Sequence, residues 1–196
     1  MKILVFDNYD SFTYNLVHII KELGYGAELD VIRNDKLTIK EVGAYDKILL
    51  SPGPGVPSDA GIMPELIKEY GATKSILGVC LGHQGIGEAF GAELYNLDTV
   101  IHGFGLNTHF KEDYLFQGMP SAFDTGRYHS WAITKESLEG TPLEVIADDE
   151  NGVVMGIRHK KYDIRGVQFH PESYLTRDLE KDLNYGKKMI ENWLKN

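Results

Sequence analysis

Short apolar runs alternate with amphipathic stretches through the first half of this sequence, and that alternation strongly constrains the fold. The apolar runs predict strands over Lys2–Phe6, Ala27–Arg33, Lys47–Ser51 and Ser75–Val79. The stretches between them predict helices over residues 11–23, 62–70 and 82–90. Strands that alternate with helices are typical of a mostly parallel sheet with helices on both faces. The sequence therefore predicts an open α/β fold.

The second half of the sequence has a different pattern. It holds short β-like runs at Val100–His102, Glu144–Ala147, Val153–Arg158 and Ile164–Phe169. We expect some of these strands to extend the main sheet and others to form a small additional antiparallel layer. A last helix is predicted over Asp178–Leu194, with Leu179, Leu183, Ile190, Trp193 and Leu194 on one face. Without repeats or linkers, residues 1–196 are expected to form a single domain.

The composition argues against several classes of protein. The net charge is −9 and basic residues cluster no further than pairs, so a nucleic-acid partner is not expected. No apolar run has the length of a membrane span, and the apolar start is too short for a signal peptide. A lone cysteine cannot form an internal disulfide. We therefore expect a cytoplasmic protein that acts on small molecules or on another protein, away from membranes.

The one cysteine, Cys80, stands where a predicted strand meets a predicted helix. Ligands of an open parallel sheet bind at the carboxyl ends of the strands, where Cys80, residues 7–15 and residues 51–55 are expected to meet. Gly78–Gly82 matches the G-x-S-x-G nucleophile elbow with cysteine in place of serine. The helix N-terminus favours a thiolate, and the Leu81 amide could stabilise an oxyanion. The alternative is a buried, inert cysteine.

A nucleophilic thiol needs a base, and seven histidines are available. His170 follows an apolar strand in the segment GVQFHPES, residues 166–173. Side chains at positions i and i+2 of an extended chain point the same way, so His170 and Glu172 could act together as base and orienting carboxylate. The alternative is a loop histidine beside an exposed glutamate.

The glycine-rich segment SPGPG, residues 51–55, raises the question of phosphate binding. It lacks the lysine and Ser/Thr of a P-loop and the glycine order of a dinucleotide site. Gly53 and Gly55 are better explained as glycines that let backbone amides approach a ligand. The histidines show no metal-ligand spacing, so no metal site is predicted.

Together these segments resemble a known family. GVCLGHQ at 78–84, SPGPG at 51–55, RYHS at 127–130 and GVQFHPES at 166–173 are similar to motifs of the class I, or triad, glutamine amidotransferases. DNYDSFTYN at 7–15 narrows the resemblance to glutaminase subunits of the anthranilate synthase and aminodeoxychorismate synthase kind. The resemblance covers essentially the whole chain. It implies a flavodoxin-like fold and hydrolysis of L-glutamine to glutamate and ammonia, which a chorismate-binding synthase subunit consumes.

The resemblance also implies roles for individual residues. Cys80 would be the nucleophile, His170 the general base and acid, and Glu172 the orienting carboxylate. The substrate would be bound by Gly53, Pro54, Gly55, Leu81, Gln84, Ser130 and Trp131, with the Leu81 amide and one from Gly53 or Gly55 forming the oxyanion hole. The resemblance implies no cofactor on this subunit.

The chain departs from the family pattern at two places. The stretch from His102 to Thr108 lacks a lysine that many members have after His-Gly, and Trp131 replaces a common leucine. Other interpretations are an amidotransferase of another pathway, such as GMP synthesis, a regulatory subunit without activity, and a free-standing cysteine hydrolase of γ-glutamyl compounds. DNYDSFTYN argues against the first, and the intact Cys80, His170 and Glu172 against the second.

Overall fold

A single mixed sheet organises the described part of the chain, as a computed structural model shows. The structure describes residues 1–178, 181 and 183–196, apart from the side chains of residues 98–101. Within these residues the strand order is β2-β1-β3-β4-β9-β8-β7-β5-β6. The first five strands of that order are parallel: β2 (Leu29–Arg33), β1 (Ile3–Asp7), β3 (Lys47–Leu50), β4 (Ser75–Val79) and β9 (Ile164–Val167). Their order is that of a flavodoxin-like sheet.

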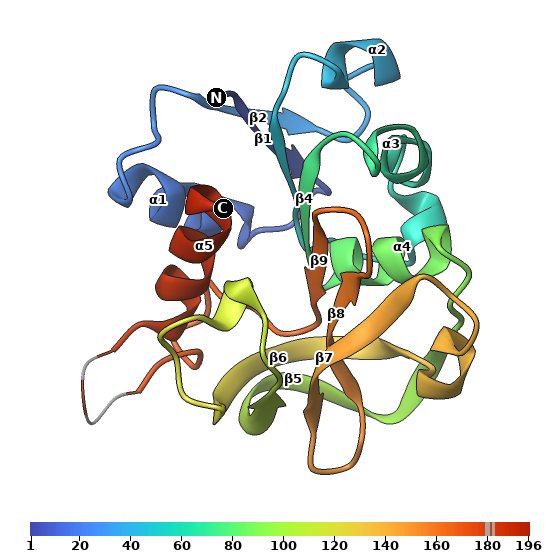
Figure 1. The fold of residues 1–196 in the computed structure, drawn as a ribbon, viewed down its shortest axis with the longest axis vertical. Coiled ribbons are helices and arrows are strands. Elements are labelled where there is room, and N and C mark those ends of the chain that lie inside the picture. The colour runs from blue at the N-terminus through green and yellow to red at the C-terminus, as the bar shows by residue number, and fades with distance from the viewer. Residues whose placement is uncertain (179–180, 182) are drawn as a thin grey trace.

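Two hydrophobic cores cover the two faces of the parallel strands. Successive side chains of a strand point to opposite faces of the sheet, so the residues of β1 alternate between the two cores. Ile3 and Val5 lie in one core, and Leu4 and Phe6 lie in the other. Figure 1 shows α1 and α5 on one side of the sheet and α2, α3 and α4 on the other. The helices are α1 (Thr13–Glu22), α2 (Ile39–Val42), α3 (Met63–Tyr70), α4 (Leu81–Ala89) and α5 (Tyr185–Lys195). The expected α/β architecture is confirmed.

The antiparallel strands continue the same sheet. They are β8 (Val154–His159), β7 (Leu143–Asp149), β5 (Leu94–Phe110) and β6 (Ala122–Ile133). β5 has 17 residues and β6 has 12, and their pairing shifts register between Asn96 and Ile101. Short 3-10 turns, at Pro57–Asp59, Tyr114–Phe116 and Lys135–Leu138, complete the elements.

The last helix is shorter than the sequence predicts. It begins at Tyr185, and the Asn184 side chain caps it by accepting a hydrogen bond from the Lys187 amide at 2.8 Å. Leu183, predicted on its apolar face, lies before the helix and is exposed, and Leu179 lies outside the described residues. The predicted apolar face is nevertheless present at Ile190, Trp193 and Leu194, which are buried against the sheet.

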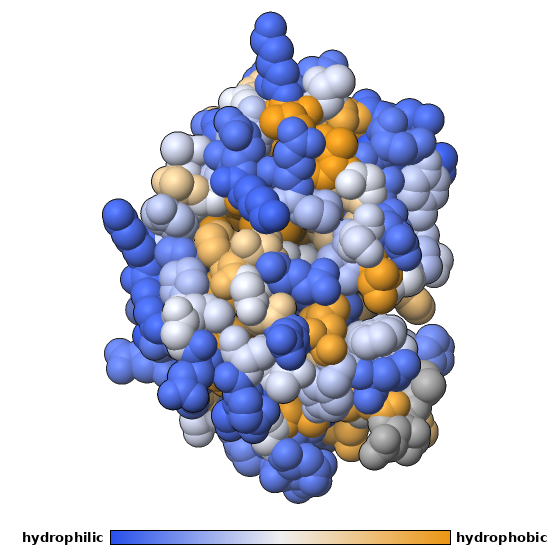
Figure 2. All heavy atoms as spheres, turned by 90° about the vertical axis from the view of Figure 1, so that its right-hand side faces the viewer, coloured by the Kyte–Doolittle hydropathy of each residue, from blue (hydrophilic) through white to orange (hydrophobic). Residues whose placement is uncertain are grey.

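The outer surfaces agree with this layered arrangement. In Figure 2 hydrophilic side chains cover much of the face that lies to the right in Figure 1, with apolar side chains showing between them. That face carries α3, whose Met63, Leu66 and Ile67 are buried, and α4, whose residues 81–87 are all buried. Among the described residues, no helix is long and apolar enough to cross a membrane.

Candidate active site

The turn between β4 and α4 holds Cys80 in a strained backbone conformation. Its φ of 52° and ψ of −101° lie in a region that non-glycine residues rarely adopt. Two backbone hydrogen bonds fix the turn, from the Cys80 amide to Val167 at 2.8 Å and from the Gln84 amide to the Cys80 carbonyl at 3.0 Å. Such strain is typical of a nucleophile elbow, where the surrounding structure forces one side chain into a defined position.

The two glycines of the elbow are required by close approach of the backbone. A methyl group on Gly78 would lie 2.5 Å from the carbonyl carbon of Gly82. A methyl group on Gly82 would lie 2.5 Å from the carbonyl oxygen of Leu50 on β3. The spacing G-x-C-x-G is therefore explained by packing of this turn against its own helix and the neighbouring strand.

The loop after β9 joins His170 to Glu172. The imidazole Nδ1 and the carboxylate Oε1 are 2.6 Å apart, and both side chains are buried. This geometry excludes the alternative of a loop histidine beside an exposed glutamate. Two backbone contacts hold His170 in place: its amide donates to Gly126 at 2.9 Å and its carbonyl accepts from the Thr176 hydroxyl at 2.6 Å.

The electrostatics of this pair favour the charged imidazolium. Burial alone would lower the pKa of His170, but the Glu172 carboxylate and the neighbouring Cys80 thiol outweigh burial and raise this pKa well above its ordinary value. His170 Nε2 is buried and makes no hydrogen bond of ordinary geometry to any of the described residues. The Cys80 side chain is nevertheless close enough to the His170 ring to influence its charge. Glu172 thus holds Nδ1 and leaves Nε2 for proton transfer at Cys80.

His129 is a poorer candidate for the base. Burial lowers its pKa to about 4, and its Nδ1 lies 2.9 Å from the carbonyl oxygen of Trp131. His83 is fully buried in α4, and burial lowers its pKa to about 3. Both rings are therefore neutral at pH 7, whereas His170 is the histidine whose environment favours charge.

The two loops predicted to meet Cys80 do so through close contacts. A methyl group on Gly53 would lie 2.6 Å from Cβ of Asn8 and 2.7 Å from Cδ2 of Leu81. The Asn8 side chain also donates to the carbonyl of Ser51 at 2.9 Å, which ties the loop after β1 to the loop after β3. The predicted meeting of three loops at the carboxyl edge is confirmed. The oxyanion-hole role of the Leu81 and Gly53 or Gly55 amides stays a prediction.

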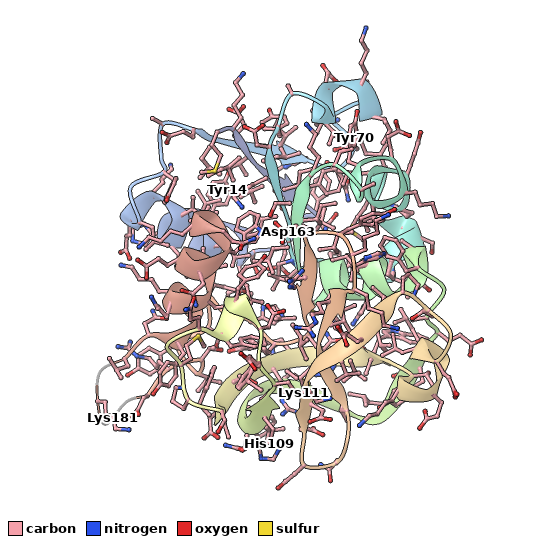
Figure 3. All side chains as sticks on the ribbon, in the orientation of Figure 1. Tyr14, Tyr70, His109, Lys111, Asp163 and Lys181 are labelled. Atoms are coloured by element: carbon pink, nitrogen blue, oxygen red, sulfur yellow. The ribbon has the colours of Figure 1, made fainter. Side chains whose placement is uncertain are left out.

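Two hollows flank the predicted catalytic groups. One has a volume of about 380 Å³ and is lined by residues that include Asn8, Pro54, Gly55 and Leu81. The other, of about 270 Å³, is lined by residues that include Phe12, Tyr128, His170 and Glu172. A larger cavity of about 920 Å³ lies elsewhere, beside Lys111, Asp113 and Arg165, and holds none of the predicted site residues. Figure 3 labels Lys111, which lines this larger cavity. It also labels Asp163, which directly precedes β9 and therefore marks the end of β9 that lies opposite His170.

Gln84 and Trp131 meet across the site. Gln84 Nε2 donates to the backbone carbonyl of Trp131 at 3.0 Å. Ser130 is half-buried and precedes Trp131 on β6. The predicted contact of Gln84 and of residues 130–131 with substrate stays a prediction. The described residues contain no group of three or more His, Cys, Asp or Glu that could hold a metal ion.

Sequence reasoning missed two residues of the site. Gln168, fully buried, donates from Nε2 to the Cys80 sulfur at 3.5 Å. Tyr128 packs its ring 5.0 Å from that of His170, and its hydroxyl lies 3.1 Å from the Ser173 hydroxyl. Gln168 stands two positions before His170, so the spacing that linked His170 to Glu172 could also have indicated it.

Comparison with known proteins gives consistent results. The chain matches the family described as Glutamine amidotransferase class-I over residues 4–190. It is 45% identical over 197 residues to anthranilate synthase component 2 of Thermus thermophilus, covering 99% of this chain and 92% of that protein. It is 43% identical over 202 residues to anthranilate synthase component 2 of Pseudomonas putida, covering 100% and 97%.

A solved structure shares the fold. A putative GMP synthase subunit from Thermoplasma acidophilum superposes with a TM-score of 0.84, covering 100% of this chain and 92% of that one. The two sequences are 24% identical, so this likeness concerns the fold alone.

Proposed function

The chain belongs to the class I glutamine amidotransferase family, and from this premise we propose that it is the glutaminase component of an anthranilate synthase. It hydrolyses the side-chain amide of L-glutamine and supplies the ammonia to a synthase subunit that aminates chorismate. The observation that carries the proposal is the strained Cys80 elbow beside the buried His170–Glu172 pair.

The first half of the reaction forms a thioester. The Cys80 thiolate attacks the amide carbon of glutamine, and the carbonyl oxygen becomes an oxyanion that the Leu81 amide and one from the Gly53–Gly55 loop stabilise. His170 Nε2 then gives a proton to the nitrogen, the carbon–nitrogen bond breaks, and ammonia leaves. A raised pKa suits His170 to this step, because the imidazolium is already charged when the proton is needed.

The second half releases glutamate. His170, now neutral, takes a proton from water, which attacks the thioester carbon. The carbon–sulfur bond breaks, the Cys80 thiolate is restored, and glutamate forms. Glu172 holds the ring through Nδ1 in both halves and is not itself a proton donor. No step calls for a metal or an organic cofactor on this subunit.

The partner follows from the relatives. Those from Thermus thermophilus and Pseudomonas putida carry the name anthranilate synthase component 2, and the number in that name supports a first component as the partner. Anthranilate formation, on the route to tryptophan, is therefore favoured over aminodeoxychorismate formation, on the route to folate. A glutaminase shared by both synthases is the alternative. A cytoplasmic location belongs to the same proposal, although a relative from Oryza sativa subsp. japonica is chloroplastic by name.

We place the partner on the face that surrounds the hollow beside His170. Exposed aromatic side chains gather on the segments there, among them Phe12, Phe104 and Tyr174. Phe12 lies at the start of α1, 5.7 Å from the Tyr128 ring, and 6.3 Å from that of His170. Aromatic anchors surrounded by polar groups are typical of protein interfaces.

The central experiment replaces Cys80 by alanine in the complex with each candidate synthase subunit. Glutamine-dependent synthesis should be abolished, because the nucleophile is gone, while synthesis from added ammonium should continue at the wild-type rate. The ammonium reaction is the control for folding and assembly, and identification of the product separates anthranilate from aminodeoxychorismate. Glutamine hydrolysis by Cys80→Ala at a near wild-type rate would overturn the proposed mechanism.

A further inference from the structure

Gln168 is the first residue after β9 and is completely buried. Its backbone amide continues the pairing with β8 by donating to Met155 at 2.9 Å, so the strand edge does not depend on its side chain. The side chain turns instead toward the elbow, where Nε2 lies 3.5 Å from Sγ of Cys80. A buried carboxamide that touches the nucleophile requires an explanation, because its polar groups lose water on burial.

The direction of the contact is fixed by its neighbours. The backbone carbonyl of Trp131 can only accept, so the Gln84 atom 3.0 Å away must be the donating Nε2. The same Gln84 nitrogen lies 3.1 Å from the Gln168 side chain, so the Gln168 atom that faces it must be the accepting Oε1. The remaining end of Gln168, which faces the sulfur, is therefore the donating Nε2. An amide flip would place two donors against each other.

We propose that Gln168 is a positioning residue that donates a hydrogen bond to the Cys80 sulfur and thereby stabilises its thiolate form. The chain of contacts runs from the Trp131 carbonyl through Gln84 and Gln168 to Sγ. The catalytic use of this thiolate rests on the proposed function. Hydrogen bonds that end on a charged atom are stronger than neutral ones, so the contact favours the thiolate over the thiol.

The same bond serves both halves of the reaction. In the first half the thiolate is the attacking group, and Gln168 holds its sulfur at a fixed place in the elbow. In the second half the thiolate is the leaving group, and the waiting donor stabilises the charge that returns to sulfur. Because Gln84 belongs to the predicted substrate-binding residues, this series of hydrogen bonds also links the predicted glutamine site to the nucleophile.

The test uses the fact that Cys80 is the only cysteine. Alkylation by iodoacetamide therefore reports on this one sulfur in the isolated chain, without glutamine or partner, and its pH dependence gives the thiolate midpoint. Gln168→Met keeps a similar volume but removes the donor, and should raise the midpoint by about one pH unit, a tenfold loss of thiolate below the midpoint. Gln168→Glu places a carboxylate oxygen against sulfur and should raise it further.

The alkylation midpoint should therefore rise from wild type to Gln168→Met and again to Gln168→Glu. A side chain that only packed against Cys80 would not produce this order of midpoints. Gln117→Met, the same change at an exposed glutamine, is the matched control and should leave the midpoint unchanged. If Gln168 variants do not fold, Gln84→Met removes the group that orients Gln168 and should shift the midpoint in the same direction by less.

Superimposable alkylation profiles of wild type and a folded Gln168→Met would overturn the proposal. So would an unshifted Gln84→Met midpoint where neither Gln168 variant folds. Each of these results would leave the proposed glutaminase function untouched. Conversely, a wild-type complex that makes no product from glutamine with either synthase subunit would overturn the proposed function without changing the alkylation midpoints. The two failures are therefore distinguishable.

Discussion

Three buried histidines, His83, His129 and His170, have pKa values shifted in opposite directions. Burial lowers the pKa of His83 to about 3 and of His129 to about 4. Burial also acts against charge on His170, but Glu172 and Cys80 more than compensate. The difference is therefore one of partners, because only His170 has a carboxylate 2.6 Å from Nδ1. Sequence reasoning identified His170 from the spacing to Glu172, which is the feature that the pKa depends on.

The His170–Glu172 pair predicts a pH-dependent contribution to stability. A histidine whose pKa is raised on folding stabilises the native state fully below its unfolded pKa of about 6.5, and this contribution is lost as the pH rises through the folded pKa. Glu172→Gln removes the charge partner at nearly constant volume. It should lower the free energy of unfolding by about 1.5–3 kcal/mol at pH 6 and by less at pH 9. Urea denaturation of both proteins at the two pH values measures the difference.

The control for this comparison is His170→Gln with and without Glu172→Gln. With the imidazole absent, the effect of Glu172→Gln should no longer depend on pH between 6 and 9. A wild-type-to-variant difference in unfolding free energy that grows with pH would show that the ring is neutral in the native state.

His170→Ala should lower the glutaminase rate almost as much as Cys80→Ala does, because general acid–base catalysis supplies about 10²–10⁴-fold. Glu172→Ala should lower this rate less.

At the scale of elements, the elbow is a strand, a turn and a helix held by two glycines. Gly82→Ala should distort the turn, because the new methyl group would meet the Leu50 carbonyl oxygen at 2.5 Å and backbone cannot move away cheaply. We expect a loss of about 1–3 kcal/mol in unfolding free energy and of most glutaminase activity. Gly85→Ala in the same helix is the matched control. Its methyl group would meet the flexible end of Met63 at 2.6 Å.

The two alanine variants separate the elbow from the helix. Alanine is favoured over glycine within a helix by about 1 kcal/mol, so Gly85→Ala should retain stability and activity. Thermal denaturation and glutaminase assays of both variants in the complex test this contrast. Equal losses at the two positions would show that the helix as a whole, and not the Gly82 approach to β3, limits the site.

The elements also show what could be predicted from the sequence. The boundaries of β4 matched because its residues form an apolar run closed by the elbow. β5 could not be delimited, because its 17 residues mix polar and exposed side chains and its pairing with β6 shifts register. Gln168 lay inside a quoted motif, but its role depends on Gln84 and Cys80, which are 84 and 88 residues away in the sequence. Such contacts follow from strand order, which local patterns do not specify.

At the scale of the whole molecule, the sheet order brings distant segments to the edge that holds the predicted active site. Tyr128 is central there, because its ring lies 5.3 Å from that of His102 on β5 and 5.0 Å from that of His170. Phe12, at the start of α1, packs against the same tyrosine. A partner that contacts these exposed segments would thus reach the His170 imidazole either directly through Phe12 or through the Tyr128 ring.

This arrangement predicts that the isolated chain hydrolyses glutamine slowly and that the synthase subunit with chorismate activates it. A displacement of about 1 Å in the catalytic groups can change the rate by about 10²-fold, so small movements at Tyr128 suffice.

Phe104 on β5 is exposed by 61% and is predicted to anchor the partner. Phe104→Ala should raise the synthase concentration for half-maximal glutaminase activity by about 30-fold, as expected for an interface hot spot of about 2 kcal/mol. Its activity without partner should stay at the wild-type level. Tyr95→Ala, near the other end of β5, is the control and should change neither quantity. Full activity of the isolated wild-type chain would rule out coupling and favour a free-standing hydrolase. Normal activation of Phe104→Ala would keep the coupling and move the interface away from β5.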